Sequence, residues 1–121
     1  MIISFVSAKG GSGKTSVAAS TAKVLANLGL QVLLIDFDSI TNGLTLLHLE
    51  NVSKIIESKN HNDKNTLKGI LEMINSSDYE NPTLIKLEEN LEFLPFNYRY
   101  SETKSGIDYK KLSEQIVLLS K

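Results

Sequence analysis

The sequence has no cysteine and no tryptophan, and it has only two prolines. Without cysteine, these residues cannot form disulfide bonds, zinc–thiolate sites or iron–sulfur clusters. A hydrophobic run of the roughly 20 residues that cross a bilayer is also missing. The opening segment MIISFV lacks the charged and long apolar regions of a secretion signal. We therefore expect a cytoplasmic protein without a transmembrane segment.

Charge of one sign is not in excess, because 13 lysine and arginine residues stand against 14 aspartate and glutamate residues, for a formal net charge of −1. Such a balance gives no overall attraction to nucleic acids or to anionic membranes. Hydrophobic residues make up 41% of the 121 residues, which is ordinary for a soluble globular chain. The length allows one domain at most.

The pattern of hydrophobic residues changes twice near the N-terminus. Ile2 to Ser7 is rich in β-branched and aromatic residues and predicts a strand, which ends at a glycine cluster. From Lys14 apolar residues recur at helical spacing, and Gly29 stands where a helix C-cap belongs. Val32 to Ile35 is continuously apolar, as in a buried parallel strand. The predicted order is a βαβ unit. The helical stripe consists of Val17, Thr21, Val24, Leu25 and Leu28.

Further elements are predicted downstream. A helix starts at Asn42–Gly43 and runs through Leu49, and a solvated loop covers Ser58 to Thr66. Leu91 to Leu94 predicts a third strand, which is stopped by Pro95. Apolar spacing predicts two more helices. One contains Leu67, Ile70, Leu71 and Ile74, and the other, near the C-terminus, contains Leu112, Ile116 and Leu119.

The segment between the first strand and the first helix indicates phosphate binding. It reads KGGSGKT over residues 9–15, a variant of G-x-x-x-x-G-K-T that lacks the first glycine. Glycines let the backbone turn tightly and point successive N–H groups inward, which forms an anion site at a helix N-terminus. Lys14 can reach the β- and γ-phosphates, and the Thr15 hydroxyl is placed to bind Mg²⁺. The alternative is a glycine-rich turn that ends in Lys-Thr by chance, and the strand–loop–helix context disfavours it.

The sequence therefore predicts a site for the phosphates of ATP together with Mg²⁺. Its binding residues are Lys9, Gly10, Gly11, Ser12, Gly13, Lys14, Thr15 and Ser16.

Two aspartates, Asp36 and Asp38, follow the second predicted strand. In an open parallel sheet, ligands bind at the carboxyl ends of the strands, so these acids should face the phosphate loop. Alternation along an extended chain puts both side chains on one side. Two carboxylates near Mg²⁺ and a γ-phosphate can order metal-bound water and orient an attacking water. The alternatives are a strand-terminal cap for Asp36 and a helix N-cap for Asp38.

With KGGSGKT intact from Lys9 onward, the chain resembles the deviant Walker A ATPases, the ParA/MinD-type partitioning and positioning proteins. The resemblance implies that Lys9 reaches across a dimer to the partner's ATP, so that dimerisation depends on nucleotide. A solvated lysine at a loop edge is the alternative. The segment LLIDFDS looks like the family's switch I motif. This implies that Asp38 is the acid tied to hydrolysis and that Asp36, like Thr15, belongs to the metal site, directly or through a water. Lys9, Lys14 and Asp38 are the candidate catalytic residues.

The resemblance covers nearly the whole chain. Residues 39–45 lack the proline and glutamine common in plasmid-partition members, which leaves the subfamily open. Residues 66–75, 82–86 and 91–97 look like the family's helix, short helix and strand ending in proline, and Tyr109 to Leu119 looks like its next helix. The implied fold is a Rossmann-like, three-layer α/β/α P-loop NTPase with a parallel sheet. Residues 1–121 would be the N-terminal portion of one ParA/MinD-like nucleotide-binding domain, ending before the Walker B strand.

An incomplete sheet would leave hydrogen-bonding edges and an apolar face unpaired. We therefore expect self-association, as a nucleotide-dependent homodimer or as an edge-pairing oligomer. The resemblance also implies a partition or adaptor protein as partner, and DNA contact through a C-terminal half.

The function expected from the resemblance is an ATP-dependent dimerising switch in DNA segregation or cellular positioning, with ATP hydrolysis by a longer protein. The alternative is a nucleotide-binding or assembly module without catalysis, and we expect feeble or no turnover from these 121 residues. His48 and His61 lack the ligand spacing of a metal pair. Tyr98 and Tyr100 flank Arg99 as in a base-stacking site, but a surface loop after a strand is the favoured interpretation.

Overall fold

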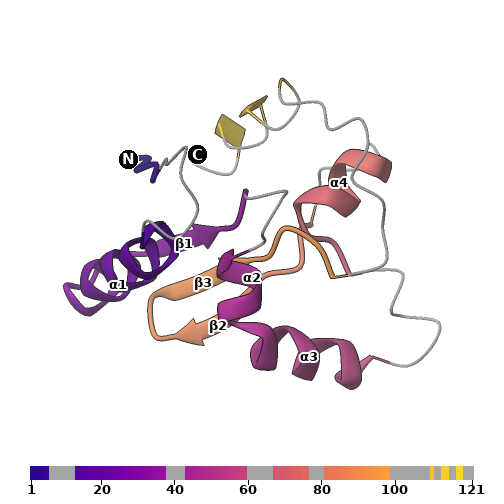
Figure 1. The fold of residues 1–121 in the computed structure, drawn as a ribbon, viewed down its shortest axis with the longest axis horizontal. Helices are drawn as coiled ribbons and strands as arrows, with labels where there is room; N and C mark the ends of the chain where they lie inside the picture. The colour runs from indigo at the N-terminus through magenta and orange to yellow at the C-terminus, as the bar shows by residue number, and fades with distance from the viewer. Residues whose placement is uncertain are drawn as a thin grey trace.

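The computed structural model describes residues 1–5, 13–37, 43–59, 67–76 and 81–98, together with positions 110, 113, 114, 117 and 118. Four helices and three strands are assigned among them (Figure 1). In chain order they are α1 (Lys14–Asn27), β1 (Val32–Ile35), α2 (Gly43–Leu47), α3 (Leu49–Ser58), α4 (Ile70–Ser76), β2 (Ile85–Glu88) and β3 (Leu91–Leu94).

The three strands form one sheet in the order β1-β3-β2. The predicted strands Val32–Ile35 and Leu91–Leu94 are confirmed as β1 and β3. They pair in parallel, from Val32 opposite Leu91 to Ile35 opposite Leu94. Their carboxyl ends therefore meet at one edge of the sheet.

β2 corrects two expectations, because it is a strand where a short helix was expected over residues 82–86, and it is antiparallel to β3. The sheet is therefore mixed. The physical reason is a two-residue turn, Glu89 and Asn90, that joins β2 to β3. Asn90 takes a positive φ of 64° there, a conformation that asparagine tolerates in hairpin turns.

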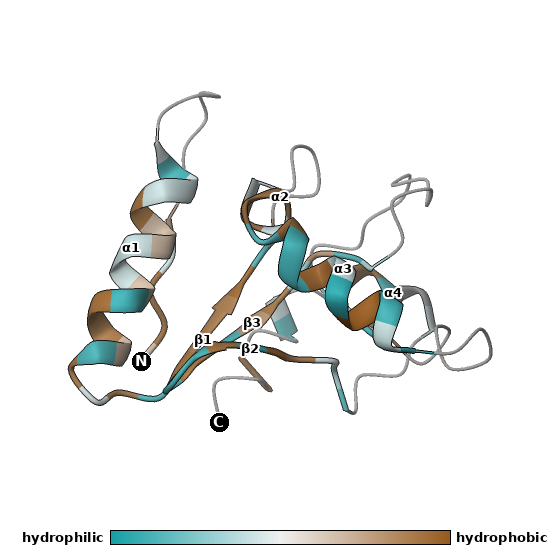
Figure 2. Cartoon of the chain, turned by 90° about the horizontal axis from the view of Figure 1, so that it is seen from below, coloured by the Kyte–Doolittle hydropathy of each residue, from teal (hydrophilic) through white to brown (hydrophobic). Residues whose placement is uncertain are grey.

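Helices pack against this sheet in two buried clusters, which confirms the mixed α/β class. One buried cluster joins the alanines of α1 and Val52 of α3 to Leu34 and Phe93. The other joins α4 to Leu94 and Phe96, with Leu33 and Ile35 packed against it. Since successive strand residues point to opposite faces, the two clusters lie on the two sides of the sheet. Figure 2 shows hydrophobic residues along β1 and β3.

Helix α1 has the predicted extent but presents the other face to the sheet. Its buried residues are the alanines at positions 18, 22 and 26, whereas Val24 and Leu28 of the predicted stripe are 57% and 73% exposed. The methyl groups of alanine let the helix axis lie close to the strands, which the larger stripe would prevent. The predicted C-cap is confirmed: Gly29 has φ +91°, and Leu30 N–H donates to the Leu25 carbonyl at 3.2 Å, the pattern of a Schellman motif.

The N-terminal strand predicted over residues 2–7 is not seen in its described part. Residues 1–5 are irregular, and Ile2 and Ile3 are about half exposed. A strand needs a neighbour for its backbone hydrogen bonds, and the three described strands pair only with one another. Phe5 alone of these residues packs against the buried cluster under α1. Residues 6 and 7 lie outside the described part.

Two helical predictions are resolved between residues 43 and 76. The helix predicted to run through Leu49 is two helices, α2 and α3, with His48 at the junction. The helix predicted from Leu67 is α4, which begins only at Ile70 because Lys68 is bonded to Thr83. The Lys68 N–H donates to the Thr83 hydroxyl at 2.8 Å, and the Thr83 N–H donates to the Lys68 carbonyl at 2.9 Å. Ile70 N–H donates to the Pro95 carbonyl at 3.2 Å, and Leu71 N–H donates to the Phe96 carbonyl at 2.7 Å. Near the C-terminus, the five described residues are helical, and the rest of the predicted helix lies outside the description.

The alanine face of α1 gives a stability prediction. Replacing Ala22 by leucine should lower the free energy of unfolding by about 1–3 kcal/mol, because the added methylenes would push α1 away from the sheet. Val24→Leu is the matched control at an exposed position of the same helix and should change stability by less than about 0.5 kcal/mol. Urea denaturation followed by circular dichroism measures both. Equal effects of the two substitutions would contradict the assigned face.

Candidate phosphate-binding site

The described part of the glycine loop begins at Gly13, the N-cap of α1, which has φ 80° and ψ 7°. This left-handed conformation suits glycine and strains residues that carry a Cβ. Val17 N–H donates to the Gly13 carbonyl at 2.9 Å, which starts the helix at once. Lys9, Gly10, Gly11 and Ser12 lie outside the described residues.

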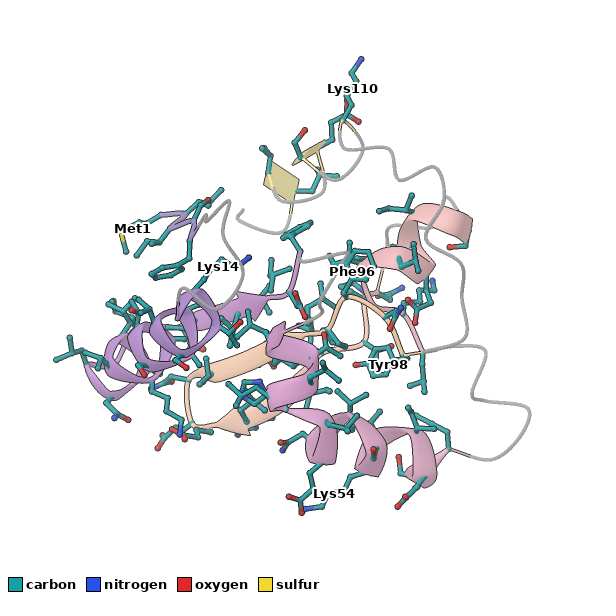
Figure 3. The ribbon with its side chains drawn as sticks, viewed as in Figure 1. Met1, Lys14, Lys54, Phe96, Tyr98 and Lys110 are labelled. Carbon is teal, nitrogen blue, oxygen red and sulfur yellow. The ribbon has the colours of Figure 1, made fainter. Side chains whose placement is uncertain are left out.

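The first turn of α1 is electrostatically open to an anion. It contains no acidic residue, and no side chain caps the N-terminus. The orientation of the N–H groups at a helix N-terminus and the helix dipole therefore favour negative charge at this end. Lys14 and Thr15 are half-buried in this turn, and Ser16 is exposed. Figure 3 shows Lys14 projecting from the start of the helix.

Asp36 directly follows β1 and is 1% exposed. Its backbone N–H continues the sheet by donating to the Leu94 carbonyl at 3.1 Å. Its Oδ2 accepts two hydrogen bonds from one residue of α2: the Thr45 N–H donates at 2.8 Å and the Thr45 hydroxyl at 2.6 Å. A buried carboxylate needs such donors, because desolvation without hydrogen bonds costs several kcal/mol.

Thr45 also receives a bond from the end of β3. Phe96 N–H donates to the Thr45 hydroxyl oxygen at 3.1 Å, and all three residues are buried. The residue thus joins the carboxyl ends of both parallel strands to α2. The sequence analysis did not single out Thr45. The available signal was one polar residue inside the apolar run LTLL at the start of a predicted helix.

The start of α2 lies against the phosphate-binding helix. If residue 43 carried a side chain, its Cβ would overlap the Thr15 hydroxyl oxygen. The structure therefore brings Thr15 and the segment that holds Asp36 to the same end of the sheet. Asp38, the predicted catalytic acid, lies outside the described residues.

The donor chemistry at this end of the sheet suits Mg²⁺. Thr15 offers a hydroxyl and Asp36 a carboxylate, both hard oxygen ligands of the kind that Mg²⁺ prefers. The described ranges contain no group of three or more His, Asp or Glu residues that could hold a metal. Mg²⁺ in phosphate sites is commonly held by one or two protein groups, with water and phosphate oxygens completing the shell. When bound, the ion would neutralise charge on the phosphates.

Two residues outside the phosphate site have structural contacts. The His48 ring lies 4.9 Å from the Phe93 ring, between centroids, and its Nδ1 is 2.9 Å from the Leu44 carbonyl. The surface-loop interpretation is wrong for Tyr98, which is buried and whose hydroxyl donates to the Thr83 carbonyl at 2.6 Å. The reason is that the chain after Pro95 packs back onto the core. His61, Arg99 and Tyr100 lie outside the described residues.

Together, the parallel β1–β3 pair, the left-handed glycine at the start of α1 and the Lys-Thr pair in its first turn are features of a P-loop nucleotide-binding protein. A family model described as an AAA domain matches residues 1–119. The chain therefore belongs to this family of P-loop ATPases of the ParA/MinD type. Comparison with curated proteins and with solved structures gave no match. Among the described helices, none is long and apolar enough to span a bilayer.

The buried Tyr98 gives a pH prediction. Burial, and then the negative charge of Glu72, raise the pKa of the Tyr98 phenol above its ordinary value of 10.0. The unfolded chain then loses this proton at a lower pH than the folded chain, so the free energy of unfolding should fall as pH rises above 10.

Tyr98→Phe tests this linkage. It should lower stability at pH 7 by about 1 kcal/mol through loss of the bond to Thr83, and it should reduce the decline above pH 10. Urea denaturation at pH 7 to 11 on both proteins measures the difference. An alkaline decline of the same size in both would contradict the assignment to Tyr98.

Proposed function

We propose that this chain binds ATP with Mg²⁺ through residues 9–16 and acts in a nucleotide-dependent dimerising switch. The observation that supports this most is the start of α1, where a left-handed Gly13 precedes Lys14 and Thr15 in an uncapped, acid-free helix turn. Membership of the ParA/MinD-type ATPase family supports the same ligand. Segregation of DNA or positioning of cellular cargo is the role that we propose for the switch.

Each loop residue has a proposed role. Gly10, Gly11, Ser12, Gly13 and Ser16 would surround the phosphates, with backbone N–H groups supplying hydrogen bonds.

The side chains add charge and metal ligands. Lys14 would contact the β- and γ-phosphates, and Thr15 would hold Mg²⁺. Asp36 would complete the metal site, directly or through a water. Asp38 would orient the attacking water, and Lys9 would reach the nucleotide of a second protomer. A partition or adaptor protein is the partner that we propose for the dimer, with DNA contact outside these residues.

A second candidate function is a nucleotide-binding or assembly module without turnover. The outer edge of β1 pairs with none of the other described strands, and such an edge is a template for strand addition from another chain. Exposed apolar residues on the outer side of α1 favour association as well. For these 121 residues, we propose binding and assembly with feeble or no hydrolysis.

The binding proposal is tested by calorimetry of ATP with Mg²⁺ on the 121-residue chain. We expect micromolar binding that Lys14→Ala abolishes, because the lysine supplies the cation at the β- and γ-phosphates. Lys54→Ala is the matched control. Lys54 is exposed and pairs with Glu50 on the surface of α3, at 3.3 Å, so binding should be unchanged. A folded wild-type chain that binds no ATP would overturn the proposal for these residues.

The assembly proposal is tested by light scattering. Without nucleotide, edge pairing should give a mass above the 13.4 kDa of one chain. ATP with Mg²⁺ should raise the dimer fraction of the wild type, and Lys9→Ala should bind ATP without this increase. A monodisperse 13.4 kDa species under both conditions would contradict self-association.

A further inference from the structure

The strongest unassigned feature is the buried hydrogen-bond chain that runs through Thr45. Its direction is fixed by donor chemistry. Phe96 contributes a backbone N–H, which can only donate, so the Thr45 oxygen is the acceptor of that bond. A hydroxyl has one proton, and the 2.6 Å distance to Asp36 Oδ2 shows that this proton is donated to the carboxylate oxygen. The chain therefore runs from Phe96 N–H through the Thr45 hydroxyl to Asp36.

This arrangement restrains the Asp36 carboxylate at two points. Oδ2 accepts from the hydroxyl and from the N–H of the same threonine, so Thr45 helps to orient the carboxylate. Both donors are buried with their acceptor, where low dielectric strengthens hydrogen bonds. A rotation of Asp36 would have to break both.

The same residue also fixes α2 next to Thr15. Thr45 is two positions after Gly43, and Gly43 packs against the Thr15 hydroxyl so closely that a Cβ would collide with it. α2 is only five residues long, so an anchor at Thr45 sets the position of its first residue. Thr45 thus holds α2 between the ends of β1 and β3 and the first turn of α1, which carries Thr15. Figure 3 labels Lys14 in that turn and Phe96 after β3.

From this geometry we infer that Thr45 is a positioning residue for the Mg²⁺–nucleotide site, acting through Asp36 and Thr15 without touching the ligand. The inference rests on the proposed function. Residues that orient a metal ligand through hydrogen bonds commonly affect metal affinity by 10- to 100-fold. Thr45 should therefore control how much Mg²⁺ strengthens ATP binding, and not ATP binding as such.

The test measures the Mg²⁺ gain, defined as the dissociation constant for ATP in EDTA divided by that in saturating Mg²⁺. Thr45→Val keeps the shape of the side chain and removes the hydroxyl. It should reduce the gain on the order of 10-fold, while affinity in EDTA should stay close to that of the wild type because the glycine loop and Lys14 are retained. Thr45→Ser restores the hydroxyl and should restore the gain.

Thr83→Val is the matched control. The Thr83 hydroxyl oxygen likewise accepts a backbone N–H, that of Lys68 at 2.8 Å, but it lies outside the phosphate site. This substitution should lower thermal stability and leave the Mg²⁺ gain unchanged. If Thr45→Val does not fold, the titration is made on Thr45→Ala, which removes the hydroxyl without placing a second methyl group against the carboxylate.

The possible outcomes separate the two proposals. A wild type that binds no ATP would overturn the proposed function and this inference with it. A wild type with a clear Mg²⁺ gain that Thr45→Val and Thr45→Ala retain in full would overturn the inference alone. An equal loss of gain in Thr83→Val would also overturn it, because the effect would then follow from general destabilisation. Hydrogen exchange gives a readout without nucleotide: the Phe96 amide should exchange faster in Thr45→Val and at the wild-type rate in Thr45→Ser.

Discussion

The parallel pairing of β1 with β3 is the constraint on which the rest of the structure depends. It joins Val32–Ile35 to Leu91–Leu94, and it aligns the points where both strands end. A shift by one residue would exchange the two faces of a strand, which would move Leu34 and Phe93 away from α1. It would also separate Asp36 from the segment after β3 that bonds Thr45. The register of one strand pair therefore decides both the core and the polar network at the carboxyl edge.

The chain segment that connects β1 to β3 supplies hydrogen-bond donors to the Asp36 carboxylate at the carboxyl edge of the sheet. Asp36 is buried, and a buried carboxylate is tolerated when donors surround it. α2 provides those donors through Thr45, and its first residue reaches Thr15. At the same end of the sheet, the first turn of α1 carries positive partial charge and a lysine. The proposed Mg²⁺–nucleotide site rests on this pairing of a positive helix end with a carboxylate.

Much of this could be predicted from the sequence. Helix α1 and its glycine cap, strands β1 and β3, and the start of α2 at Gly43 follow from local patterns. Local patterns are informative there because apolar periodicity and the φ requirements of glycine act within a few residues. The valines and leucines at helical spacing do not mark the buried face of α1, because Val24 and Leu28 are exposed. Only the strands opposite the helix show that small alanines face the sheet.

The sequence by itself determined the phosphate motif, the α/β class and the family, because each depends on residues that are close together along the chain. The tertiary structure decided the features that join distant segments. These are the hairpin of β2 with β3, the return of Tyr98 into the core, and the bonds of Thr45 to Asp36 and Phe96. The sequence does not predict which backbone amide or carboxylate a helical threonine will hydrogen-bond, because strand register and packing determine that partner.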